Sequence, residues 1–204
     1  MRSLTRILVM LASFATSTVI LGQSSLAVKL NAEANRAYYQ GRAEEALGKF
    51  EAARKAASDA RDRQYETIAM YGLARANIKL CNPREADRWF KASIEARDAL
   101  PDDEYAQVTQ NLVEYSRFLL VLGRPAEAIP LMERAIPKLD SIDLGASDPI
   151  AFAEFFDDYA GALEGSGLSS EAARSRASKL REANVGKIAK FKPEPYPVQC
   201  KTLP

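Results

Sequence analysis

Small residues recur at fixed distances from a turn position, four times along the chain, and this pattern constrains the fold more than any other feature. Each turn residue is followed five positions later by an alanine, and successive alanines are 40, 42 and 44 residues apart. Another small residue lies twelve positions before each alanine. The turn residues are Gly41, Cys81, Gly123 and Gly167, the alanines are Ala46, Ala86, Ala128 and Ala172, and the preceding small residues are Ala34, Ala74, Ser116 and Ala160. Small residues that face each other across a turn let antiparallel helices pack closely, so the pattern predicts stacked helical hairpins.

The hairpin around residues 112–135 carries the clearest local signals. Gly123 can adopt the left-handed conformation that ends a helix, and Pro125 has the φ angle that suits the first turn of the next one. Four positions after the first three alanines, large side chains are expected to fill the space between the helices: Phe50, Phe90 and Met132. The fourth repeat fits less well, because Arg176 and Lys179 stand at positions that are apolar or small elsewhere.

Proline, serine and aspartate mark the other boundaries. Asn82 and Asp148 each precede a proline, which predicts an N-cap followed by the first residue of a helix. Pro137 is expected to end its helix, because proline removes a backbone hydrogen bond. Residues 140–148 are rich in Ser, Gly and Asp and predict a long loop.

The first 27 residues have the three parts of a secretory signal. Arg2 and Arg6 supply positive charge, residues 7–21 are mostly apolar, and Ser25 and Ala27 are small residues suited to cleavage. Cleavage after Ala27 would place the mature protein in the periplasm or outside the cell. The alternative is an uncleaved membrane anchor at residues 7–22, although this stretch is shorter than the roughly 20 residues that span a bilayer.

Composition excludes several classes of function. The chain has 28 basic and 27 acidic residues, which argues against a nucleic-acid-binding surface. It has no histidine, the most common general base and metal ligand. We find no catalytic triad, Gly-rich phosphate loop or HExxH motif. We therefore expect no enzymatic activity, no cofactor and no bound metal.

The hairpins resemble the tetratricopeptide repeat (TPR). The resemblance rests on the small residue of the first helix, such as Ala74 or Ser116, and on Ala-x-x-x-Phe in the second, as in Ala86 and Phe90. It departs from the TPR pattern three positions after the small residue, where a large residue is expected and repeats one and two have Ala37 and Asn77. The period exceeds the usual 34 residues and resembles the longer variant of kinesin light chains. The resemblance implies an all-α fold: a right-handed α-solenoid of about four helix-turn-helix repeats. We assign residues 1–27 to the signal, 28–189 to the repeat domain and 190–204 to a Pro-rich tail.

In TPR proteins the first helices of the repeats line a concave groove that binds extended peptides. The resemblance places eight residues in that groove: Asn31, Asn35, Tyr38, Tyr39, Tyr71, Arg75, Lys79 and Arg117. Asn35, Arg75 and Arg117 are at equivalent positions and are expected to form a row that suits carboxylates and carbonyls. The same face of repeat four is acidic, with Glu154, Asp157 and Glu164. The alternative is that these are ordinary solvated helix faces. The carboxylate clamp of chaperone adaptors is not expected, because only Asn35 matches it.

Cys81 and Cys200 are the only cysteines. In an oxidising compartment they could form a disulfide that pins the tail beside the second repeat. The alternative is a small turn residue and an unpaired tail thiol, which we prefer at this stage because sequence fixes no geometry.

The sequence therefore predicts an exported, non-enzymatic TPR adaptor or scaffold that binds a protein or peptide in its groove. Tyr38, Tyr39, Arg75 and Arg117 are the expected anchors, since aromatic residues and arginines often dominate binding energy. The alternative function is structural self-association through the fourth repeat, giving a homo-oligomer within an envelope complex. A membrane contact is expected only if the N-terminal segment is not cleaved.

Overall fold

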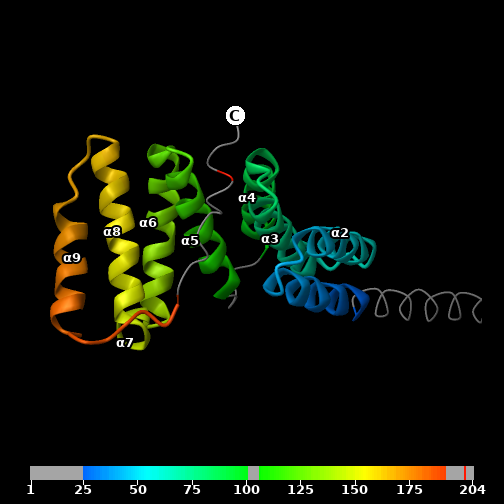
Figure 1. The fold of residues 1–204 in the computed structure, drawn as a ribbon, viewed down its shortest axis with the longest axis horizontal. Helices are drawn as coiled ribbons and strands as arrows, with labels where there is room; N and C mark the ends of the chain where they lie inside the picture. Colours follow the sequence, from blue (N-terminus) through cyan, green and yellow to red (C-terminus); the bar gives the residue numbers. More distant parts are fainter. Residues whose placement is uncertain (1–24, 101–105, 192–199, 201–204) are drawn as a thin grey trace, which may run out of the picture. The chain divides into compact units, whose positions relative to one another are not determined.

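The computed structural model describes residues 25–100, 106–191 and Cys200. Its regular elements in these residues are helices, so the predicted all-α fold is confirmed (Figure 1). The chain begins with a helix at residues 25–39. The helices that follow are α2 (Ala43–Asp59), α3 (Arg63–Lys79), α4 (Pro83–Asp98), α5 (Ala106–Val121), α6 (Pro125–Ser141), α7 (Leu144–Ser147), α8 (Pro149–Gly165) and α9 (Glu171–Glu182).

The chain divides into two compact units, which we describe separately. Unit 1 comprises Met1–Asp103 and Pro197–Pro204, and unit 2 comprises Glu104–Tyr196. In unit 1, α3 packs against both α2 and α4. In unit 2, α5 pairs with α6, α8 pairs with α9, and α6 contacts α8. The predicted repeats are therefore helix pairs, two in each unit. The handedness of a four-repeat stack stays a prediction.

The four predicted turn residues all adopt the left-handed conformation. Gly41, Cys81, Gly123 and Gly167 have φ angles of 76°, 59°, 69° and 70°. After each of them, a backbone N–H bonds to a carbonyl five residues earlier, as from Asn82 to Asn77 at 2.9 Å. This bond is the mark of the Schellman motif, which closes the C-terminal end of a helix. The turn prediction is confirmed, and Cys81 is the non-glycine member of the set.

The small residues lie where the helices of each pair approach. Side chains with no exposed surface are found at both predicted positions in repeats one to three, and at the first position in repeat four: Ala34, Ala46, Ala74, Ala86, Ser116, Ala128 and Ala160. Phe50, Phe90 and Met132 are likewise buried beside them. In unit 1, Phe50 joins a core cluster that includes Ala34, Ala37, Leu73 and Ala76. Close packing of these helix pairs therefore rests on the residues that the repeat pattern selected.

Repeat four corrects one prediction. Ala172 is exposed, and the buried residues of α9 are Ala173 and Ala177. The connection is longer here, because α9 begins four residues after Gly167, whereas α4 begins two residues after Cys81. Because of the longer connection, α9 packs against α8 through residues one position later than the repeat pattern selects. The apparent decay of the fourth repeat is thus a register shift of one residue.

The C-terminal half of α6 corrects two more predictions. The helix continues past Pro137 to Ser141, and a short helix, α7, lies within the predicted loop 140–148. Pro130 and Pro137 are both exposed on α6. Each proline removes a backbone hydrogen bond, but water can solvate the freed carbonyl on an exposed face, so the helix continues.

At the N-terminus, the described chain begins within the segment assigned to the signal. Residues 1–24 lie outside the described residues, but residues 25–27 belong to the first helix. Ala27 is fully buried and packs with Ala56 and Ala57 of α2. In the described part of the chain, no helix is long and apolar enough to span a membrane.

Asp148 joins the end of unit 2 to the start of α8. Its carboxylate accepts a hydrogen bond from the Ala151 backbone N–H at 3.3 Å, so it is the predicted N-cap. It also accepts from the backbone N–H groups of Lys190, at 3.0 Å, and Phe191, at 2.7 Å. The chain after α9 returns past α7 to reach this point (Figure 1). Most of the predicted tail, residues 192–199 and 201–204, lies outside the described residues.

Candidate functional site

Five of the predicted groove residues meet in unit 1 and form what we call the Tyr/Arg cluster: Tyr38, Tyr39, Tyr71, Arg75 and Lys79. Tyr38 and Tyr39 end the helix of residues 25–39. The other three lie on α3 at intervals of four residues, so they occupy one face of that helix. The cluster therefore joins the first helices of repeats one and two, as the resemblance implied.

Arg75 is the centre of the cluster. Its Cζ atom lies 4.2 Å from the ring centroid of Tyr38, 5.4 Å from that of Tyr39 and 5.5 Å from that of Tyr71. Its Nη2 atom donates a hydrogen bond to the Tyr39 hydroxyl at 3.4 Å. The residue as a whole is only 7% exposed, and stacking of the guanidinium on electron-rich ring faces compensates for part of its lost hydration. Arg75 is thus a positioning residue that fixes the three rings.

The surface of the cluster is formed by Tyr39 and Lys79. Tyr39 is 67% exposed, whereas Tyr38 and Tyr71 are buried. Tyr38 and Tyr39 pack edge to face, with ring centroids 5.5 Å apart. Lys79 is half-buried, and its Nζ atom lies 5.4 Å from the Tyr38 ring centroid. The most exposed part of the cluster is therefore the Tyr39 ring, with the half-buried Lys79 on the same cluster.

Asn31 and Asn35 are used inside their own helix. The Asn31 amide donates to the Ala27 carbonyl at 3.1 Å, and the Asn35 amide donates to the Asn31 carbonyl at 3.0 Å. Asn31 is buried and Asn35 is half-buried. Both side-chain amides thus donate hydrogen bonds to backbone carbonyls of their own helix. Asn31 in particular presents little surface to a ligand.

Arg117 belongs to unit 2, whereas the other predicted groove residues belong to unit 1. Its Nε atom donates to Asp158 Oδ2 of α8 at 2.6 Å, in an ion pair that is largely shielded on the arginine side. Asn35 and Arg75 belong to unit 1. The predicted row of Asn35, Arg75 and Arg117 is thus divided between the units and stays a prediction.

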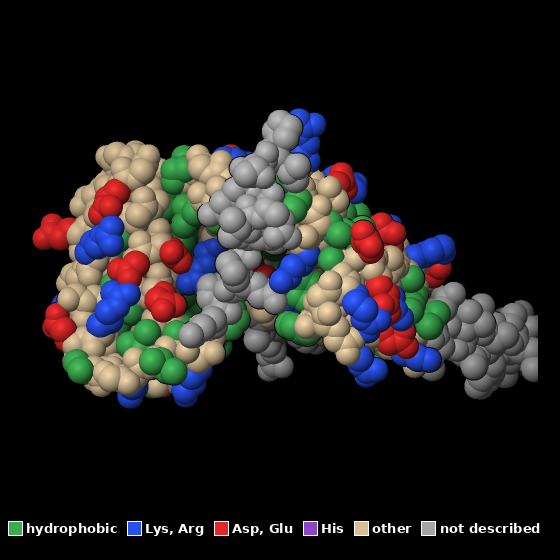
Figure 2. All heavy atoms as spheres, in the orientation of Figure 1, with side chains coloured by type: hydrophobic (Ala, Val, Ile, Leu, Met, Phe, Trp, Pro, Cys, Tyr) green, Lys and Arg blue, Asp and Glu red, His purple; other side chains and the backbone are tan. Residues whose placement is uncertain are grey.

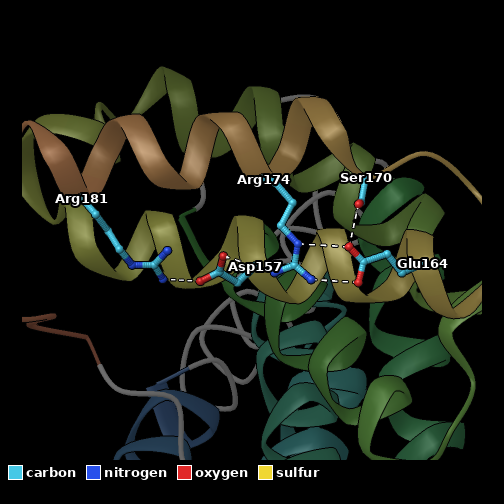
Figure 3. Close-up of polar contacts among 5 residues, drawn as sticks. All are labelled: Asp157, Glu164, Ser170, Arg174 and Arg181. Atoms are coloured by element: carbon cyan, nitrogen blue, oxygen red, sulfur yellow. Dashed lines mark hydrogen bonds and ion pairs between the residues drawn. The ribbon is translucent and has the colours of Figure 1, made fainter.

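The acidic face of α8 is largely paired with α9. Glu164 accepts hydrogen bonds from the Ser170 hydroxyl at 2.6 Å and from Arg174 Nη2 at 2.8 Å, and Asp157 pairs with Arg181 (Figure 3). Arg174 and Ser170 donate to the Glu164 carboxylate and so lower its pKa, while Glu164 raises the pKa of Arg174. The hydrogen bond to Asp157 raises the pKa of Arg181. Asp157 and Glu164 therefore serve to join the two helices, in contrast to the predicted acidic end of a groove.

Cys81 and Cys200 form a disulfide, with their Cα atoms 5.0 Å apart. Cys200 is buried, and its Sγ atom lies 3.7 Å from the Ile78 carbonyl oxygen of α3. Both cysteines belong to unit 1. The preference for two unpaired thiols is therefore wrong. The sequence contained no signal for this geometry, because 119 positions separate the two residues.

The described surface carries both signs of charge. On the face drawn in Figure 2, Lys and Arg side chains are interspersed with Asp and Glu. Among the described residues, no group of three or more His, Cys, Asp or Glu is placed to hold a metal ion. The Tyr/Arg cluster is thus the most distinctive concentration of predicted site residues.

Comparison with known proteins supports the fold. No family model matches the sequence, and no curated protein matches it. The structure is similar to the crystal structure of BtubC (BKLC) from P. vanneervenii, with a TM-score of 0.67 and 18% sequence identity. The match covers 83% of this chain and 68% of BtubC, a TPR-type protein. At this identity the likeness shows the fold alone, which is a TPR-like helical-repeat fold.

Proposed function

We propose that this protein is an exported, non-enzymatic scaffold that binds an extended segment of another protein at the Tyr/Arg cluster. The observation that carries the proposal is the buried Arg75 guanidinium, which holds Tyr38, Tyr39 and Tyr71 in fixed positions. Rigid aromatic side chains provide contact area at little cost in conformational entropy, so they are suited to binding.

The chemistry of the cluster favours a particular class of ligand. The exposed ring of Tyr39 can pack against proline or aromatic side chains, and the Lys79 ammonium can donate to backbone carbonyls. Extended Pro-rich segments leave their carbonyls unbonded and are commonly recognised by aromatic surfaces. We therefore expect the ligand to be an extended segment that contains proline. This differs from the sequence-based expectation of a ligand that is recognised through its carboxylate groups.

Two observations support export. The N-terminal residues have the pattern of a secretory signal. The Cys81–Cys200 disulfide is typical of proteins in oxidising compartments. These observations support the proposal of a periplasmic or secreted location, with membrane anchoring by residues 7–22 as the alternative.

The binding proposal is tested by crosslinked capture with purified protein, followed by affinity measurement on the captured segment as a synthetic peptide. We compare wild type with Tyr39→Ala and with Tyr159→Ala, a matched control in unit 2 whose hydroxyl donates to Glu133. Loss of a central tyrosine should weaken binding by about tenfold or more, as is usual for an anchor residue. Tyr159→Ala should bind like wild type. Equal affinity of all three proteins would contradict the proposal.

Self-association is a second candidate, favoured by exposed apolar residues after the last helix. Val185 and Ile188 are 86% and 79% exposed. Exposed apolar side chains at the end of a repeat array are suited to contact with a second copy. Sedimentation equilibrium of wild type and the Val185→Asp/Ile188→Asp double variant tests this function. A wild-type oligomer that dissociates in the variant supports it, and a monomeric wild type rules it out.

A further inference from the structure

We propose that the loop of residues 183–191, which follows α9, binds unit 2 to the surface of an anionic membrane. The inference goes beyond the proposed function, because it concerns a different surface from the Tyr/Arg cluster and a lipid in place of a protein segment. It uses only the proposed export, which would bring the protein beside a membrane. It needs no contribution from residues 7–22, the membrane contact that the sequence predicts.

Three large apolar side chains of the 183–191 loop are exposed. Val185, Ile188 and Phe191 are 86%, 79% and 41% exposed, and the first two are the most exposed large apolar side chains among the described residues. Single exposed apolar residues are ordinary on a protein surface, whereas several on one short segment indicate an interaction surface.

The loop is held at both ends, so the exposure of these side chains is part of the fold. At its start, the Asn184 side chain donates a hydrogen bond to the Leu180 carbonyl of α9 at 2.8 Å. At its end, the buried Asp148 carboxylate accepts from the backbone N–H groups of Lys190 and Phe191. A loop whose backbone is already fixed loses little conformational entropy when it binds.

The loop is also basic. Its nine residues include two lysines and no acidic residue. Lys187 and Lys190 are both exposed, and their ammonium groups donate to the Asn184 side-chain oxygen and to the Ser147 carbonyl, each at 2.8 Å. Both acceptors are neutral, so these bonds leave the positive charges uncompensated. The loop therefore presents positive charge beside its apolar side chains.

This combination fits a membrane interface. Apolar side chains can enter the headgroup region of a bilayer, while lysines extend their stems and bring their ammonium groups to anionic phosphates. The loop runs along the lower edge of unit 2 in Figure 1, and hydrophobic and basic side chains lie along that edge in Figure 2. Charge complementarity thus favours an anionic lipid surface as the partner.

A contact made by the loop alone suits a second copy of the chain less well. Its nine residues are fewer than the roughly 20 to 30 that each side of a stable protein interface contributes. In a two-fold dimer the same patch meets itself, so Lys187 and Lys190 would lie near their own counterparts. The loop has no acidic residue to pair with them.

The test measures how strongly brominated lipid quenches tryptophan fluorescence in the full chain. Ile188→Trp places the reporter in the loop. Leu168→Trp is the matched control, because Leu168 is also an exposed apolar residue but precedes α9, at the opposite end of that 12-residue helix. Wild type, whose single tryptophan is Trp89 of unit 1, supplies the background. The vesicles contain brominated phosphatidylcholine, with or without phosphatidylglycerol.

With anionic vesicles, quenching at position 188 should exceed quenching at position 168 by about threefold or more, because only the loop enters the headgroup region. Adding Lys187→Gln/Lys190→Gln to Ile188→Trp should raise the lipid concentration for half-maximal quenching by about tenfold or more. Vesicles without phosphatidylglycerol should act like this lysine variant. Local quenching reports the loop itself, so vesicle binding by another part of the chain does not imitate the result.

Three outcomes would overturn the inference. The first is equal quenching at positions 188 and 168, or none at 188. The second is equal quenching with and without phosphatidylglycerol, since the lysines would then have no role. The third is a reporter at position 188 that lipid does not quench but that becomes protected from iodide as the protein concentration rises, which would assign the loop to contact with a second copy.

Discussion

The disulfide between Cys81 and Cys200 joins residues that are 119 positions apart, and the covalent loop that it closes contains all of unit 2. Unit 1 contributes both cysteines, so the chain leaves unit 1 after α4 and is bonded back to it at Cys200. The bond therefore adds a second covalent connection to the one that the backbone makes. It restricts the unfolded chain and fixes Cys200 on unit 1.

Two substitutions at Cys81 separate the effect of the bond from that of the turn. Cys81→Ser and Cys81→Gly both remove the disulfide, but only glycine adopts the φ angle of 59° without a steric cost. We expect Cys81→Gly to be more stable than Cys81→Ser by about 1 kcal/mol. Both should be less stable than oxidised wild type, by up to about 4 to 5 kcal/mol for a loop of this length. Urea unfolding followed by the fluorescence of Trp89 in unit 1 measures each difference. Equal stability of the serine and glycine variants would show that the turn imposes no steric cost on a side chain.

We predict that position 72 requires glycine, because a side chain there would collide with Phe50. A Cβ atom at Gly72 of α3 would overlap the Phe50 ring, and this ring is buried in the core of unit 1. Gly72→Ala should therefore destabilise unit 1 by about 1 to 3 kcal/mol through overpacking. Gly48→Ala on α2 is the matched control, because nothing lies within 4 Å of its added Cβ. The control should stabilise the helix by about 0.5 to 1 kcal/mol. Thermal unfolding measures both, and a shift of the same sign in the two variants would contradict the packing argument.

The contact between α8 and α9 should weaken at low pH. Arg174 and Ser170 lower the pKa of Glu164 in the folded chain, so folding favours the ionised carboxyl group. Its stabilisation is fully present above the unfolded pKa, about 4.3, and is lost as the pH falls through the lower folded pKa. The protection of α9 amides against hydrogen exchange, relative to that of α3 amides, should fall on acidification below pH 4. In Glu164→Gln this loss of protection should be smaller. An identical pH response in the variant would assign the effect to other carboxyl groups.

The repeat pattern predicted much of the fold because close helix packing demands small residues at definite positions. Gly41, Cys81, Gly123 and Gly167 are turn residues in the structure as expected. The same reasoning failed at Pro137, since a proline on an exposed face allows a helix to continue. Periodicity reports which residues are buried, and it is less informative about where a helix ends.

The candidate site was predictable only in part. The resemblance selected Tyr38, Tyr39 and Arg75, and the structure brings them together. It could not indicate that Arg75 is buried by the rings, because stacking depends on side-chain conformations that the sequence does not specify. The bond to Cys200 depends on the path of the whole intervening chain, and the repeat period contains no information about it.

The register of α9 can be tested directly, because the repeat pattern and the structure select different alanines for the interface with α8. The repeat pattern selects Ala172 for the helix interface, whereas the structure buries Ala173 and exposes Ala172. Ala173→Leu should therefore destabilise unit 2 by about 1 to 3 kcal/mol, because its larger side chain does not fit against α8. Ala172→Leu makes the same chemical change one position earlier and should alter stability by no more than about 0.5 kcal/mol. Thermal unfolding followed by circular dichroism compares the two. The reverse order of stabilities would restore the register of the first three repeats.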